Sequence, residues 1–169
     1  YIYGRIGQDE DNESDRATSS KQIIEQLLQF SESPGDVSIL LHSLGGTYDD
    51  VLETLHFQRM LPFKIDVYCF GCALAESSML LFGSTGTRVI SSGARLTTTD
   101  VYEDVGFLNA SKLEAYGKMI SSRRKQLLDF ISERSAANIG ELESELFQGT
   151  SRPLIPSRAA ALGLVDEVQ

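Results

Sequence analysis

The chain has 169 residues, 41% of them hydrophobic, which is enough for one domain with a buried core. Its net charge of −9, from 15 Lys and Arg against 24 Asp and Glu, disfavours phosphate backbones and anionic lipid surfaces, so we expect no nucleic-acid or membrane partner. Neither a signal-peptide pattern nor an apolar run of about 18 residues is present, which predicts a cytoplasmic protein. If the source is eukaryotic, we expect an organelle stroma or matrix instead, and if it is viral, the host cytoplasm.

Apolar runs and helical patterns alternate along the first half of the chain. Ile23, Ile24 and Leu27 recur at helical spacing, whereas the continuous run at 37–41 is typical of a strand buried on both faces. The expected elements are a strand at 1–4, a loop over 8–20, a helix over 20–30, a buried strand at 37–41, a helix over 51–60 and another buried strand at 65–70.

The second half continues this alternation, so the fold class is α/β and residues 1–169 form a single domain. We expect a core helix at 73–82, strands at 89–90 and 95–99, a long helix over 109–134, a short helix at 157–162 and a closing strand at 164–168. The helix over 109–134 is longer than a core of this size requires. We expect it to project and meet a partner chain, and a helix wrapped along the domain is the alternative.

Two cysteines, Cys69 and Cys72, have C-x-x-C spacing, and Cys69 falls inside an apolar run. We expect buried thiols, with a redox or metal role as the alternative. Beyond the histidines His42 and His56, the sequence has no second Cys/His cluster that would complete a zinc site, so we expect no metal and no cofactor. His42 is expected to be a strand-end residue rather than a base.

Three motifs, in order along the chain, span almost the whole sequence. They are S-L-G-G-T at 43–47, F-G-C-A-L-A-E at 70–76 with G-T-R at 86–88, and S-R-A-A-A-L-G-L-V-D at 157–166. They resemble the S-P-G-G-S loop, the G-Q-A-A-S-M-G-A-F-L-L segment with its following G-x-R, and the closing A-x-E-A-x-x-x-G-L-V-D of the Clp protease proteolytic subunit family.

This resemblance implies a ClpP/crotonase-like superhelix of β-β-α turns with a protruding helix, the handle. The head would comprise residues 1–100 and 140–169, and the handle about 101–139. In that family the handle stacks one heptameric ring on another, so the resemblance implies self-association into heptameric or tetradecameric rings. The handle residues expected to make this contact are Tyr102, Val105, Phe107, Leu113, Tyr116 and Ile120.

Carrying the family's catalytic positions onto this chain gives three residues that cannot perform the chemistry. The nucleophile's position falls on Ala75, or on Leu74 when counted back from Gly83, the general base on Thr99 and the orienting acid on Ser151. An aliphatic side chain cannot attack a carbonyl, and a threonine hydroxyl cannot accept a proton near pH 7. The resemblance therefore implies a naturally inactive member, similar to the ClpR-type subunits.

The glycines of the first motif, Gly45 and Gly46, let backbone amides approach a ligand closely, as in an oxyanion hole, and the resemblance places the second amide of that hole at Glu76. We expect Glu76 to be an ordinary acid in a helix's first turn, worth about 0.3–1 kcal/mol, and a carboxylate that blocks the hole is the alternative. Ser77 and Ser78 are alternative nucleophiles, although we expect them to be small residues that pack a core helix.

The sequence therefore predicts a catalytically inactive Clp subunit that forms rings, alone or with active Clp subunits, and has a structural or regulatory role in ATP-dependent proteolysis. An AAA-type unfoldase is a further candidate partner, although the axial loop that helps to dock it in the family is expected to be missing before Tyr1. One alternative is an active serine peptidase with a non-standard site, in which Ser43 is a further candidate nucleophile. The other is a crotonase-like module that binds acyl-CoA.

Overall fold

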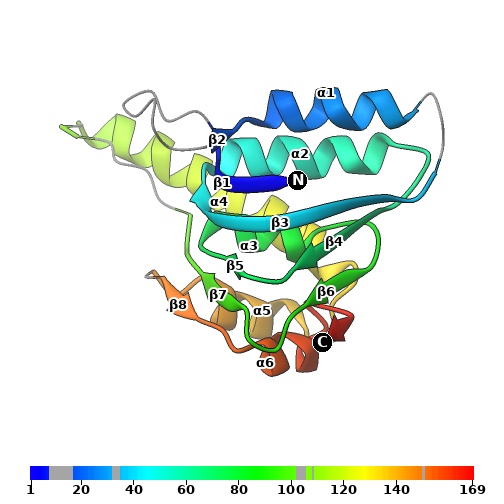
Figure 1. Ribbon diagram of the computed structural model, residues 1–169. Coiled ribbons are helices and arrows are strands. Elements are labelled where there is room, and N and C mark those ends of the chain that lie inside the picture. The colour runs from blue at the N-terminus through cyan, green and yellow to red at the C-terminus, as the bar shows by residue number, and fades with distance from the viewer. Residues whose placement is uncertain (8–16, 32–34, 102–105, 108, 150) are drawn as a thin grey trace.

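The computed structural model describes residues 1–7, 17–31, 35–101, 106–107, 109–149 and 151–169. A largely parallel sheet runs through the described part in the strand order β8-β7-β5-β3-β4-β6-β9, and β1 pairs with the free edge of β3 and with β2 (Figure 1). The strands are β1 (Ile2–Ile6), β2 (Ala17–Thr18), β3 (Val37–Gly46), β4 (Ile65–Cys69), β5 (Cys72–Ala73), β6 (Arg88–Ile90), β7 (Arg95–Thr98), β8 (Arg152–Pro153) and β9 (Glu167–Val168).

The longest strand, β3, connects two parts of this curled sheet. Its first half pairs with β4, and its second half pairs with β1 on one edge and, through Ser43, with Ala73 of β5 on the other. Parallel pairing requires a crossover between consecutive strands, and helices α1 (Ser20–Ser31), α2 (Tyr48–Met60) and α3 (Glu76–Phe82) supply crossovers here. The fold class is α/β, as the sequence predicts.

Two predicted strands differ from expectation in burial. Side chains of β3 and β4 alternate between buried and accessible, so these strands are buried on one face and not on both. Ile39 and Leu41 face the core, whereas Ser38 and Leu40 face the opposite side. Strand β3 also runs through the predicted loop as far as Gly46, because Gly45 and Gly46 pair with β1.

Helix α3 begins later than predicted. Ala73, expected in the helix, forms the short strand β5 together with Cys72, and the helix starts at Glu76. All seven residues of α3 are buried: Glu76 at its start and the six that follow, from Ser77 to Phe82. A helix that is apolar or small on every side is typical of the centre of a core.

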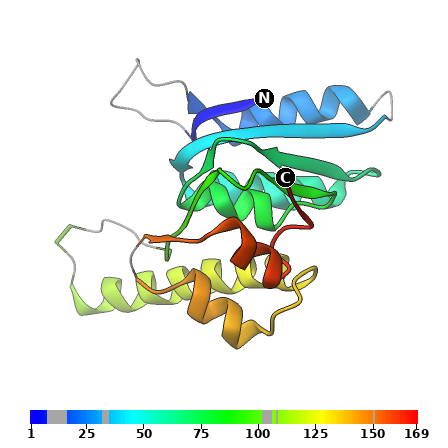
Figure 2. The same cartoon turned by 60° about the horizontal axis from the view of Figure 1, so that its bottom comes forward.

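The long helix α4 (Ala110–Ser132) begins at Asn109, whose side chain caps it by accepting a hydrogen bond from the amide of Lys112. Its buried residues, Leu127, Leu128, Phe130 and Ile131, all lie near its end. Figure 2 shows the beginning of α4 extending past the other helices. The helix therefore projects, as expected, and its last turns pack on the core.

The segment after α4 contains an element that the sequence analysis missed. Helix α5 (Ile139–Leu146), capped by Asn138, packs against α4 through Leu142 and Leu146. Strand β8 then pairs antiparallel with β7, and α6 (Pro156–Ala161) leads to β9 at the sheet edge beside β6. No helix in the described ranges is long and apolar enough to cross a membrane.

An ion pair between the buried Arg88 and the partly exposed Asp166 joins the segment before β9 to strand β6. The Arg88 side chain is 2% exposed, and its guanidinium donates two hydrogen bonds to the Asp166 carboxylate, at 2.7 and 3.0 Å. Arg134 also donates to Asp166, at 3.2 Å. Burial raises the pKa of Asp166, but the hydrogen bonds and charges of the two arginines outweigh burial and hold that pKa below its ordinary value.

We predict that Asp166→Asn lowers the free energy of unfolding by about 3 kcal/mol at neutral pH, because it leaves the buried Arg88 charge uncompensated. Since the pKa of Asp166 is lowered in the fold, the wild type loses this advantage as the pH falls below 3.8, and the two proteins should converge there. Urea denaturation at several pH values measures the difference. Lys118→Met, which breaks the exposed pair with Glu114, serves as a control and should cost under about 1 kcal/mol.

Candidate functional site

Four neighbouring strands end close together, and the site lies at these ends. Strands β3, β5 and β7 are parallel, so their carboxyl ends meet at one edge. Strand β8 runs the other way, and its pairing of Arg152 with Thr98 brings Ser151, the next residue in that register, opposite Thr99. The positions predicted from sequence, Ala75, Thr99 and Ser151, thus follow or precede adjacent strands.

The turn between β5 and α3 has a strained backbone at Ala75. This residue has φ 51° and ψ −126°, the one positive φ among the described non-glycine residues. Such conformations cost about 1–3 kcal/mol and occur at functional sites. The Ala75 amide donates to Thr97 Oγ1 at 2.9 Å. A sharp, strained turn from strand to buried helix is the geometry of a nucleophile elbow, which here presents a methyl group.

The other two positions predicted from sequence carry hydroxyl side chains in different surroundings. Thr99 is 6% exposed, and its carbonyl accepts a hydrogen bond from the Tyr48 hydroxyl at 2.7 Å. Ser151 is exposed. Neither side chain is charged or basic near pH 7, so neither could take a proton from a nucleophile.

Two glycines at the end of β3 face the start of α3. Gly45 has φ 124°, and a Cβ on Gly46 would lie 2.1 Å from the Ile6 carbonyl oxygen, so the backbone requires glycine at both positions. The Gly46 amide donates to Oε2 of Glu76 at 3.3 Å. Glu76 is therefore a first-turn acid, as expected, but its carboxylate points at the two glycines.

Burial governs the acidity of Glu76, which is 5% exposed. Loss of solvation raises the pKa of this carboxyl, and hydrogen bonds from its own amide and from Gly46, together with the charge of Arg5, offset the increase only in part. Ionised Glu76 is consequently less stable in the fold than in water.

The alternative nucleophiles are buried, and their hydroxyls bond to the backbone. Ser77 and Ser78 are each 0% exposed and donate to the carbonyls of Leu74 and Ala75, both at 2.7 Å. Ser43 is also 0% exposed and donates to the Gly45 carbonyl at 3.0 Å. A hydroxyl held in this way points its proton at a backbone carbonyl and not at a base.

The two cysteines are free and buried, and His42 contacts one of them. His42 Nε2 lies 3.5 Å from Cys72 Sγ, and its ring stacks on Tyr3 with centroids 4.8 Å apart. Burial, reinforced by the nearby Cys72, raises the pKa of Cys69 to about 12, so this thiol stays protonated at neutral pH. Within the described residues, no group of three or more His, Cys, Asp or Glu is placed to hold a metal.

Comparison with known proteins decides the family. The Clp protease profile matches residues 11–169. The chain belongs to the Clp protease family. It is 25% identical to an ATP-dependent Clp protease proteolytic subunit 4 of Streptomyces avermitilis over 89% of this chain and 67% of the relative. It is also 25% identical to a proteolytic subunit 1 of Shouchella clausii, over 99% of this chain and 88% of the relative.

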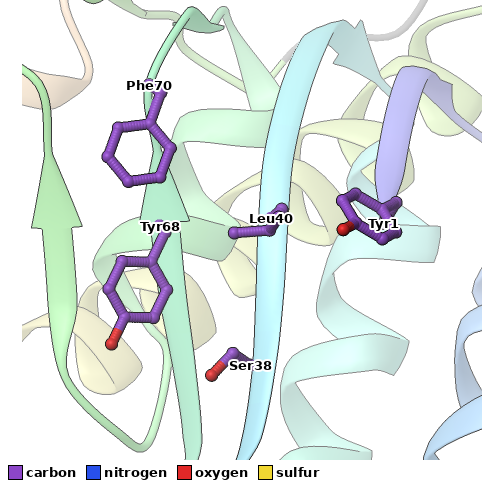
Figure 3. A pocket seen from close by; sticks show the side chains of 5 residues that line it. All are labelled: Tyr1, Ser38, Leu40, Tyr68 and Phe70. Atoms are coloured by element: carbon purple, nitrogen blue, oxygen red, sulfur yellow. The ribbon is translucent and has the colours of Figure 1, made fainter.

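This Clp family member also has an aromatic pocket, which the sequence analysis missed. The pocket, of about 490 Å³, lies on the face of the sheet opposite the core, between the rings of Tyr1, Tyr68 and Phe70, with Ser38 and Leu40 at its base (Figure 3). The Tyr68 and Phe70 rings lie 6.2 Å apart. Alternation along 37–41 was the available signal, but the apolar Leu40 concealed it.

The predicted handle residues of this Clp family member divide into three groups. Phe107 and Leu113 are exposed, the latter by 60%. Tyr116 and Ile120 are half-buried along α4. Tyr102 and Val105 lie outside the described residues.

We predict that Ala75→Gly raises the free energy of unfolding by about 1 kcal/mol. Glycine adopts φ 51°, ψ −126° without the strain of about 1–3 kcal/mol, and this gain exceeds the cost of about 0.5–1 kcal/mol for a more flexible unfolded chain. Chemical denaturation measures the change. The matched control Ala159→Gly, in α6 at a residue that is 0% exposed, should instead be destabilising by about 1 kcal/mol.

We predict that Glu76→Gln makes the protein more stable than the wild type at neutral pH but not at acid pH. Because the pKa of Glu76 is raised in the fold, its ionisation lowers wild-type stability as the pH rises from the ordinary value of 4.5 through the folded pKa. Glutamine keeps an acceptor for the Gly46 amide and does not ionise. Thermal unfolding of both proteins between pH 4 and pH 8 tests this, and a constant difference would contradict it.

Proposed function

We propose that this chain is a proteolytically inactive Clp subunit that assembles into rings, alone or with active Clp subunits, and adjusts their activity or choice of partner. Ala75 carries the proposal: the strained elbow is present, but its side chain is a methyl group. Thr99, which follows β7, and Ser151, which precedes β8, support it because neither can serve as the base or acid of a triad.

The projecting part of α4 supports ring assembly. The first turns of α4 bury no side chain within the chain, and the apolar Leu113 there is 60% exposed. The apolar Phe107, just before the helix, is fully exposed. Exposed apolar groups on a projecting element are typical of an interface with another chain. Leu113 and Phe107 are therefore the contact residues that we propose for ring stacking.

The aromatic pocket supports a further partner. The two relatives described above are named as proteolytic subunits of ATP-dependent Clp proteases. An AAA-type unfoldase is the ATP-dependent partner that we propose, and the pocket lined by Tyr1, Tyr68 and Phe70 offers it an apolar surface.

A peptidase with a non-standard site has less support. Each serine near the elbow donates its hydroxyl to a backbone carbonyl, and His42 contacts Cys72 and Tyr3. The crotonase-like alternative would require an acyl-CoA ligand with basic residues for its phosphates. In the sequence's one run of three basic residues, at 123–125, Arg123 and Arg124 already pair with acids of the same chain.

We predict that native mass spectrometry of the protein, alone and mixed with an active Clp proteolytic subunit, detects rings, and that the protein alone neither cleaves peptides nor reacts with a fluorophosphonate probe. In mixed rings the cleavage rate per active subunit should change. Leu113→Asp should weaken stacking of rings, whereas the control Met60→Asp, at an apolar residue of 79% exposure on α2, should not. A monomer that forms no mixed ring, or specific labelling of a serine, would overturn the proposal.

A further inference from the structure

The side chain of Glu76, at the elbow, contacts the backbone at the end of β3. Oε2 of Glu76 accepts a hydrogen bond from the Gly46 amide at 3.3 Å and lies 3.2 Å from the position that a Cβ on Gly45 would occupy. Glu76 is also the first residue of α3, so its own backbone amide opens that helix. The carboxylate thus fills the space between the end of β3 and the start of α3.

These two amides are the pair that an elbow uses to hold a negatively charged oxygen. At a strand-to-helix elbow, one donor is the amide of the residue after the elbow, here Glu76, and the other comes from a neighbouring strand end, here Gly46. Such donors stabilise an oxyanion because they are fixed in place and shielded from water. In this chain the Gly46 amide already has an anionic partner, the Glu76 carboxylate.

Burial argues that Glu76 is not in this place for stability. The residue is 5% exposed, and desolvation makes its ionised form unfavourable in the fold. A carboxylate at a helix's first turn gains helix-dipole stabilisation while exposed to water, with no need to turn inward. Arg5 on β1 is the charged group whose attraction offsets part of this cost.

We propose that Glu76 is an internal plug, whose carboxylate occupies the Gly46 amide at the elbow and excludes the carboxylate or tetrahedral oxyanion of a peptide. The inference rests on the proposed function and deepens it: the site is closed by Glu76 independently of the missing nucleophile. Replacing the triad residues alone would therefore leave it closed.

The first test reads the contact itself and needs no catalysis. Gly45–Gly46 is the one Gly-Gly pair in the sequence, so labelling with glycine that carries both ¹³C′ and ¹⁵N selects the Gly46 amide in a carbonyl-filtered spectrum. Its proton shift should titrate with Glu76, and the titration should vanish in Glu76→Gln but persist in the control Glu114→Gln, at an exposed acid. A Gly46 signal that does not titrate, or that titrates equally in Glu76→Gln, would refute the plug.

The second test opens the site chemically. Ala75→Ser, Thr99→His and Ser151→Asp are combined, with Glu76 either kept or changed to Met, the residue of the family motif. A fluorophosphonate then reports access: the serine oxygen bonds to phosphorus, fluoride leaves, and the proton passes to the introduced imidazole. Because one oxyanion-hole donor is worth about 10²–10³ in rate, labelling should be about 100-fold faster with Glu76→Met.

The two proposals fail in different ways. Equal labelling of the combined variants with and without Glu76→Met contradicts the plug and leaves the wild type an inactive subunit. If the combined variants do not fold, the Gly46 titration in the wild type still decides the inference. Peptide cleavage by the wild type contradicts the proposed function, while the Gly46 amide still shows whether Glu76 holds it.

Discussion

The complete burial of helix α3 is the constraint on which the site depends. Its residues from Ser77 to Phe82 are each 0% exposed, so the helix can begin only inside the core, directly below the sheet. The chain must pass from β5 to this helix within two residues, and that tight turn places Ala75 in a strained conformation. Strain of this kind persists only where the surrounding structure over-determines it, as the hydrogen bond to Thr97 does here.

The same turn sets stability against chemistry. After Ala75, the hydroxyls of Ser77 and Ser78 donate hydrogen bonds to the backbone carbonyls just before the helix. These bonds suit buried polar groups, but they also occupy the two hydroxyls that could act as nucleophiles. Directly after Ala75, Glu76 places a carboxylate in low-dielectric surroundings, which a chain selected only for stability would avoid. The elbow therefore combines well-satisfied polar groups with one that is unfavourably buried.

Sequence reasoning predicted the strand and helix order well because hydrophobic periodicity is strong in this chain, and three motifs gave the family. It failed where several residues act together. Ala73 and Leu74 suit a helix locally, so nothing in the sequence marks the start of α3 at Glu76. Helix α5 was missed because its eight residues, with Gly140 near the start, form a short pattern. The direction of the Glu76 side chain depends on the backbone of Gly46, 30 residues away.

The ion pair between Arg88 and Asp166 has a consequence for the order of events during synthesis. The two residues are 78 positions apart, and β9, the partner of β6, follows Asp166 directly. A nascent chain that has not yet reached Asp166 can assemble β3, β4 and β6, but it holds a guanidinium in the core without its counter-charge. Completion of the domain then waits until the segment that carries Asp166 has left the ribosome, so this contact couples the folding of the sheet to the synthesis of a segment 78 residues later.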